Sequence, residues 1–187
     1  MIYPIYLDGS KVLREKAQAV DIANEKKEEL QQLLQDMFDT MKKADGCGLA
    51  APQIGISKRI LVVDGNYFAE VYPELAGFNR MMINPEFTFK SEETSEYNEG
   101  CLSIPHLDAD IVRPKKVTIK YLDRDLNEIE ETFDDFAARM IQHEMDHLDG
   151  MMFIDRAAPI RKKILSGKLN SIAKGSVRTA YKVKLEK

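Results

Sequence analysis

The sequence predicts an α+β fold in which antiparallel strands pack around a central helix that bears an HExxH motif, with an N-terminal and a C-terminal helix. Two observations predict this fold class. Helical stretches separate the strand segments, and a tight turn joins neighbouring strands into a hairpin. This arrangement favours antiparallel pairing over a doubly wound parallel sheet. No repeat or linker divides the chain, so we expect residues 1–187 to form a single domain.

The N-terminal helix is expected over residues 24–43. Apolar residues in this stretch follow the i, i+3, i+4, i+7 spacing that gathers side chains on one helix face. They are Leu30, Leu33, Leu34, Met37, Phe38 and Met41. Asp45-Gly46 then breaks the helix.

Strands are expected in the middle of the chain. β-Branched or alternating residues predict them at 59–64, 84–89, 117–121 and, after a hairpin turn at 123–127, at 128–133. Residues 67–80 contain Pro73 and Gly77 and are typical of a surface loop.

The motif-bearing helix is expected over residues 134–148. Asp134 or Asp135 can cap its start, and Gly150 suits the left-handed residue after its end. A basic helix at 160–173 and a strand-like tail at 177–185 complete the chain.

Composition excludes several functional classes. The 27 Lys and Arg residues against 31 Asp and Glu residues leave a net charge of −4, so the chain lacks the basic excess that DNA binding needs. No apolar run approaches the ~20 residues of a membrane span. The first residues lack the pattern of a signal peptide, and two cysteines do not make a disulfide framework. We therefore expect a cytoplasmic protein.

The strongest chemical signal is HEMDH at residues 143–147. Histidines at i and i+4 lie one turn apart on the same helix face, so His143 and His147 can reach one metal ion. Glu144 can then serve as general base for a metal-bound water. A surface helix with chance histidines is the alternative, but these are two of only three histidines in the chain.

A catalytic zinc-type site usually needs a third protein ligand. The metzincin pattern is broken because Phe153 stands where its third histidine should be, and the only glutamate after Glu144 is the distant Glu186. Two alternatives stay open. Cys101 offers a soft thiolate, although a lone cysteine is often a small buried hydrophobe, and Asp155 offers a downstream carboxylate.

Residues 46–55 read GCGLAAPQIG, which leaves the backbone almost bare. Such a segment lets a substrate backbone approach closely, although a plain tight turn would look similar. Cys47 lies in this segment. Gln53 is a polar amide among apolar neighbours and could donate to a developing oxyanion.

Three segments, in this order, resemble those of the peptide deformylase family: GCGLAAPQ at 46–53, EGCLS at 99–103 and QHEMDHLDG at 142–150. The resemblance implies roles residue by residue. Cys101, His143 and His147 would hold the metal, and Glu144 would be the general acid/base. Gln53 and the backbone N–H of Leu102 would stabilise the oxyanion. Gly46 and Gly48 would line a groove where the substrate pairs as an extra strand.

The resemblance also implies cofactor and substrate. One ferrous ion per chain is expected, with zinc, nickel or cobalt able to replace it. The metal-bound water would attack the formyl carbon of N-terminal formyl-methionine on new polypeptides and release formate. We expect a monomer. The basic residues after 160 could touch the ribosome near its tunnel exit, although a solvated helix face is the simpler interpretation.

One feature departs from the apolar side-chain pocket that this family implies. Arg139 and Met140 precede His143 by four and three residues and so share its side of the helix. We expect the aliphatic stem of Arg139 to line the pocket, with its head in solvent. His106 is expected to be an exposed loop histidine.

The sequence is also compatible with two functions other than deformylation. A zinc endopeptidase would use His143, His147 and Asp155. A ribosome-binding protein without activity would keep the site as a relic and use the basic C-terminal segment.

Overall fold

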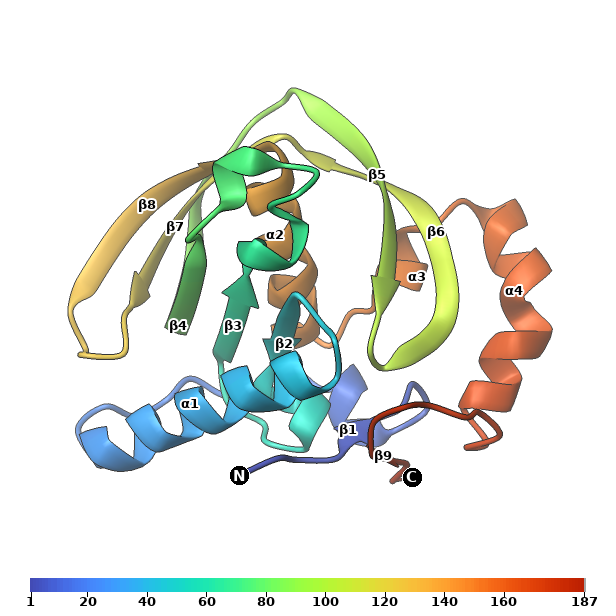
Figure 1. Cartoon of the computed structure of the whole chain (residues 1–187), viewed down its shortest axis with the longest axis horizontal. Coiled ribbons are helices and arrows are strands. Elements are labelled where there is room, and N and C mark those ends of the chain that lie inside the picture. The colour runs from blue at the N-terminus through green and yellow to red at the C-terminus, as the bar shows by residue number, and fades with distance from the viewer. Residues whose placement is uncertain (187) are drawn as a thin grey trace.

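The computed structural model describes residues 1–186 and has an α+β architecture with antiparallel sheets (Figure 1). The larger sheet has the strand order β2-β3-β4-β7-β8. Its strands are β2 (Gly48–Ala50), β3 (Ile60–Asp64), β4 (Asn79–Lys90), β7 (Lys116–Leu122) and β8 (Glu128–Asp134). All their pairings are antiparallel, so the predicted sheet type is confirmed.

Two smaller pairs complete the β structure of the described residues. β5 (Thr94–Cys101) and β6 (Ile104–Pro114) form an antiparallel hairpin joined at Leu102 and Ser103. β1 (Ile5–Tyr6) pairs in parallel with β9 (Val183–Lys184), which brings the two ends of the chain together.

The helices are α1 (Lys27–Lys43), α2 (Asp135–Leu148), the short α3 (Phe153–Arg156) and α4 (Pro159–Ile172). Short 3-10 turns lie at η1 (Lys11–Arg14), η2 (Ala51–Ile54), η3 (Gly65–Phe68) and η4 (Pro73–Leu75). In Figure 1, α2 lies between the large sheet and the β5–β6 hairpin, and α4 lies on the outer side of β6. No helix within residues 1–186 has the length and apolar character that a bilayer span requires.

The expected stripe of the first helix is confirmed. Leu30, Leu34, Met37 and Met41 of α1 are at most 2% exposed and pack on the face of the large sheet opposite α2, while Leu33 and Phe38 are partly buried beside them. We call the four buried residues of α1, together with Leu49, Ile60 and Val62, the α1 cluster.

The start and end of α2 also follow the sequence. The Asp134 carboxylate accepts a hydrogen bond from the backbone N–H of Asp135. Gly150 has φ of +74°, and a Cβ there would lie 2.7 Å from the carbonyl oxygen of Arg14. Only glycine fits this left-handed position without strain, and it lets the chain leave the helix axis directly after α2.

The β5–β6 hairpin is the main element that the sequence interpretation missed. Its first strand carries polar residues on both faces, which hides the strand pattern. The second strand does alternate, with Leu107, Ala109 and Ile111 buried between exposed aspartates. The tail prediction was too long, because only Val183–Lys184 of residues 177–185 forms a strand.

Candidate active site

Cys101, His143 and His147 meet at the junction of β5 and α2. Their ligand atoms all lie within 4.8 Å of one another, and Cys101 Sγ lies 3.3 Å from His147 Nε2. One thiolate and two imidazoles suit a divalent transition metal, and three protein ligands leave a position open for catalysis. The donor set therefore fits a catalytic metal ion.

Glu99 orients the first histidine. The Nδ1 of His143 lies 3.0 Å from Glu99 Oε1, which leaves Nε2 as the ring nitrogen for an ion. Arg113 binds Glu99 through Nε at 2.9 Å and through its terminal nitrogen at 3.1 Å. Burial alone would raise the pKa of Glu99, but His143 and Arg113 outweigh it and lower this pKa to about 2.

The same arginine continues a buried network of charges. Arg113 donates to Asp146 at 2.7 Å, and Arg156 of α3 binds that carboxylate at 2.6 Å. We call Glu99, Arg113, Arg139, Asp146 and Arg156 the Glu99 network. Because buried charges are costly unless they are paired, this network constrains where β5, β6, α2 and α3 can lie.

The two histidines differ in electrostatic setting. Burial opposes charge on His143, yet hydrogen bonds with Cys101 and Glu99 outweigh it and hold its pKa well above the ordinary value. Burial lowers the pKa of His147 well below the ordinary value, and the neighbouring His143 adds to the effect. A neutral His147 is ready to act as a metal ligand.

Glu144 lies beside these ligands but has a different environment. Its side chain is buried, and Oε2 has no hydrogen-bond partner among residues 1–186. Burial raises its pKa to about 7, and a carboxyl with that pKa can both take and return a proton near neutral pH. A Cβ on Gly48 would lie 2.2 Å from Glu144 Oε1, so this glycine makes room for the carboxylate.

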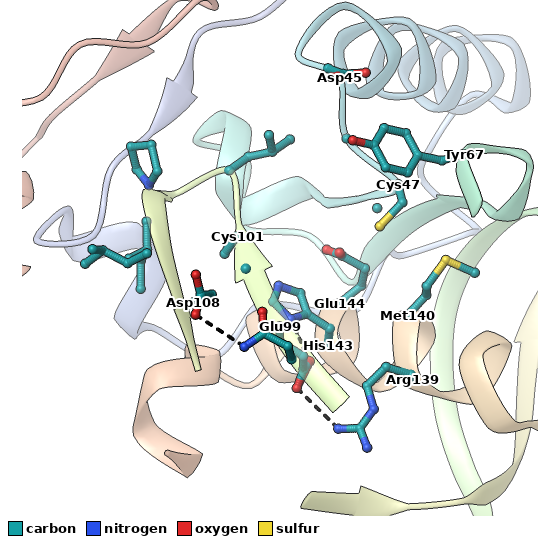
Figure 2. Close-up of a pocket in the computed structure, with 18 of the residues that line it drawn as sticks. Asp45, Cys47, Tyr67, Glu99, Cys101, Asp108, Arg139, Met140, His143 and Glu144 are labelled. Carbon is teal, nitrogen blue, oxygen red and sulfur yellow. Dashed lines mark hydrogen bonds and ion pairs between the residues drawn. The ribbon is translucent and has the colours of Figure 1, made fainter. Parts of the chain in front are cut away.

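A cavity of about 590 Å³ opens in front of the site. Figure 2 shows Glu144, His143, Cys47 and Tyr67 around it. Gly46, Gly48 and Met140 also line it, as the sequence predicted, together with Phe68 and Phe136, whose ring centroids lie 4.6 Å apart. An extended, largely apolar ligand is the chemistry that such walls favour.

The prediction for the head of Arg139 is wrong. This side chain lines the cavity, but its guanidinium is buried instead of lying in solvent. It donates to the carbonyls of Ile111 at 2.9 Å and Ser95 at 2.7 Å. It also binds Glu99 at 3.3 Å, as Figure 2 shows. The partners come from the β5–β6 hairpin, which the sequence interpretation missed.

Gln53 and Leu102 flank the ligand group. The Gln53 amide nitrogen lies 3.5 Å from Cys101 Sγ and 3.2 Å from Ser103 Oγ, while its oxygen accepts from the Ala50 N–H at 2.8 Å. Leu102 directly follows Cys101 in the turn between β5 and β6. The structure thus brings both residues to the site.

Other sequence candidates lie outside the ligand group. Burial raises the pKa of Cys47 to about 12, so its thiol stays protonated and is a poor ligand. The alternative ligand Asp155 instead binds Arg14 at 2.6 Å and the N–H of Met152 at 2.8 Å. His106 is exposed, as predicted, but lies in β6 rather than in a loop, and its ring is 2.7 Å from the Arg178 carbonyl.

The fold and the site point to a metal-dependent hydrolase, with an HExxH helix, a cysteine and two histidines that could hold a metal ion, and a buried glutamate beside an open cavity. A family model for polypeptide deformylase matches residues 2–163. Peptide deformylase of Fusobacterium nucleatum is 44% identical over 179 residues, which cover 95% of this chain and 97% of that protein.

Solved structures agree. The peptide deformylase of Thermotoga maritima is 38% identical, has a TM-score of 0.75 and covers 85% of this chain and 99% of that one. A Plasmodium falciparum peptide deformylase is 32% identical, has a TM-score of 0.81 and covers 91% of this chain and 95% of that one. The chain therefore belongs to the polypeptide deformylase family, and the resemblance inferred from three short segments is confirmed.

Proposed function

We propose that this protein removes the N-formyl group from the N-terminal formyl-methionine of newly made polypeptides and releases formate. The observation that carries the proposal is the buried Glu144 carboxylate, with a pKa of about 7, beside the Cys101, His143 and His147 ligand atoms. We infer that residues 1–187 act as a single catalytic domain, arranged around the HExxH helix.

Cys101, His143 and His147 would hold one ion per chain, which we propose is ferrous iron, replaceable by zinc, nickel or cobalt. The soft thiolate and the imidazoles are ligands that all four metals accept. Such an ion supplies Lewis acidity, which activates a water molecule and polarises a carbonyl.

Glu144 moves the protons in this mechanism. Its carboxylate takes a proton from the attacking water and later delivers it to the leaving amine nitrogen. Burial keeps the proton affinity of this group high enough for the first transfer and low enough for the second near pH 7. An exposed glutamate, with a pKa of about 4.3, would hold the proton too weakly.

Gln53 and the backbone N–H of Leu102 stabilise negative charge on the formyl oxygen in the transition state. Donors held in fixed positions in a buried site are the usual means of such stabilisation. Gly46 and Gly48 admit the extended peptide backbone. A Cβ at Gly46 would lie 2.7 Å from the Leu102 side chain, which would narrow the groove at the reacting carbonyl.

The first side chain of the substrate packs against Met140, Phe136 and the stem of Arg139. The terminal nitrogens of Arg139 already bind Glu99 and two carbonyls, so they are not free to attract an acidic side chain. We therefore expect formyl-methionyl peptides to be cleaved better than formyl-glutamyl peptides.

The proposed setting is the cytoplasm, with the protein acting as a monomer. Part of the basic C-terminal segment has internal partners, because Arg161 binds Asp108 and Lys162 binds the Asp155 carbonyl. Contact with the ribosome stays a prediction that rests on the other basic residues of this segment.

The direct test is anaerobic purification, metal analysis and a formate-release assay on formyl-Met-Ala-Ser. We expect one iron per chain and formate release that is lost on chelation. Cleavage of an internal bond in an unformylated peptide, without formate release, would instead support the endopeptidase alternative.

A further inference from the structure

The C-terminal tail reaches the active site through one side chain. Beyond α2, only Tyr181 lines the cavity among the described residues, and its hydroxyl donates to the Leu102 carbonyl at 2.7 Å. The family model ends at residue 163, so this tyrosine lies outside the segment that it matches. We propose that Tyr181 is a positioning residue that holds the Leu102 turn in the orientation needed for oxyanion stabilisation.

The turn at Leu102 and Ser103 is held from three directions. Tyr181 binds the Leu102 carbonyl, the N–H of Asp8 donates to the Ser103 carbonyl at 2.8 Å, and Gln53 donates to Ser103 Oγ at 3.2 Å. These partners come from the tail, the N-terminal segment and η2. Of these three bonds, only the Tyr181 bond is made to Leu102 itself. It holds the Leu102 carbonyl and so restricts rotation about the Cα–C bond of the residue whose N–H is proposed to face the substrate.

The tail is itself anchored at a separate place. Beyond Tyr181, β9 pairs with β1, with the Ile5 N–H donating to the Lys182 carbonyl at 2.9 Å (Figure 1). Nearby, the Tyr6 hydroxyl donates to Glu186 at 3.1 Å and accepts from Lys184 at 2.9 Å. Tyr6 thus holds the same tail without contacting Leu102 and offers a matched control.

Loss of the Tyr181 hydroxyl would free the Leu102 carbonyl to turn toward water. The Leu102 N–H belongs to the preceding peptide unit, so it would lose its preset direction through the loosened turn, while the metal ligands, Glu144 and the walls of the cavity stay in place. Because such a donor acts mainly in the transition state, the loss should appear in kcat more than in KM. A single neutral hydrogen bond corresponds to a fall of roughly five- to tenfold.

The experiment compares Tyr181→Phe with Tyr6→Phe in the metal-loaded enzyme. This inference rests on the proposed role of Leu102, so formate release by the parent is measured first. Tyr181→Phe should lower kcat about five- to tenfold on both formyl-Met amide and formyl-Met-Ala-Ser, with KM and metal content unchanged. Amide hydrogen exchange in residues 102–104 should be faster in this variant, whereas Tyr6→Phe should match the parent in both readouts.

Three outcomes would overturn the proposal. An active parent with an equally active Tyr181→Phe variant shows that the hydroxyl does not position the donor. Equal losses in both variants show that Tyr181 only anchors the tail. A rise in KM confined to the longer peptide shows that Tyr181 contacts the substrate instead of Leu102. A parent without formate release contradicts the proposed function itself.

Discussion

The α1 cluster and the Glu99 network are both buried, yet they are built from opposite chemistry. Leu34, Met37 and Met41 of the α1 cluster are fully shielded from water and make only apolar contacts with the sheet. Glu99 and Arg113 of the network are 6% and 3% exposed and form ion pairs with several partners. The first arrangement is non-directional, and the second fixes distances and angles.

Stability and orientation have separate sources in this molecule. Burying apolar area stabilises the fold in proportion to the area removed from water. A buried ion pair contributes little net stability, but removing one partner leaves an uncompensated charge. We therefore expect the network to position His143 at a small net gain in stability. We expect the α1 cluster to act mainly on the stability of the fold and to contact the site only where Leu102 and Tyr181 pack against its edge.

The largest expected effect is a fall in kcat on substitution of Glu144, without a loss of stability. Glu144→Gln should lower kcat about 10³-fold, because the proton carrier is lost, while metal content and thermal stability stay at or above the parent values. Formate release and metal analysis check this. Loss of the metal, or turnover near the parent rate, would contradict the role of Glu144.

Arg113→Met tests the network directly. It leaves Glu99 and Asp146 buried without their main partner, so we expect a loss of about 3–5 kcal/mol in the free energy of unfolding and weaker metal retention. Denaturant unfolding and metal titration measure both. Arg113→Lys keeps the charge but not the forked geometry, so its unfolding free energy and metal retention should lie between those of the parent and Arg113→Met. Parent-like stability in Arg113→Met would remove the distinction between the two regions.

Leu34→Ala is the counterpart in the α1 cluster. A cavity in a shielded site should cost about 2–5 kcal/mol of unfolding free energy, while kcat per folded molecule stays unchanged. Leu34→Met, with nearly the same volume, should cost less than about 1.5 kcal/mol. A fall in kcat without unfolding would show that this cluster also positions the site.

Gly48→Ala sharpens the comparison at the site itself. The three atoms nearest to the added methyl would all belong to the Glu144 side chain, so the carboxylate must shift to make room. We expect kcat to fall roughly 10–100-fold, within the range of lost general acid–base catalysis. In the Glu144→Gln background the same change should have little further effect. If the losses in kcat from the two substitutions add in the double variant, Gly48 acts on substrate binding and not through Glu144.

The smallest effect concerns Asp64, where β3 ends beside α1. Burial raises the pKa of Asp64, but hydrogen bonds from Lys42 and Asn66 outweigh it and lower this pKa below its ordinary value. A lowered carboxyl pKa stabilises the fold above the unfolded pKa, about 3.9, and this contribution is lost progressively as pH falls from there through the lower folded pKa. Asp64→Asn should cost about 1 kcal/mol at pH 7, and this difference from the parent should narrow on acidification. Thermal unfolding at pH 7 and pH 3 checks this, and a difference that is undiminished at pH 3 would argue against an ionic origin.

The elements that rest on local patterns could be predicted from the sequence. The α1 stripe, the β7–β8 hairpin and the ends of α2 follow from periodicity and capping, which act over a few residues. His143, Glu144 and His147 were visible for the same reason, because one helix carries them. Cys101 could be nominated from its chemistry, but only a resemblance to known sequences decided between it and Asp155.

Contacts between groups far apart in the sequence became visible only in the folded structure. The missed hairpin supplies Glu99 and Arg113 and the carbonyls that bind Arg139, so the surroundings of these side chains could not be deduced from helix α2 alone. Tyr181 reaches Leu102 across 79 positions of sequence through the pairing of β9 with β1. Such contacts depend on long-range packing and on the pairing of buried polar groups. Neither produces a regular spacing of residue types that could be recognised in the sequence.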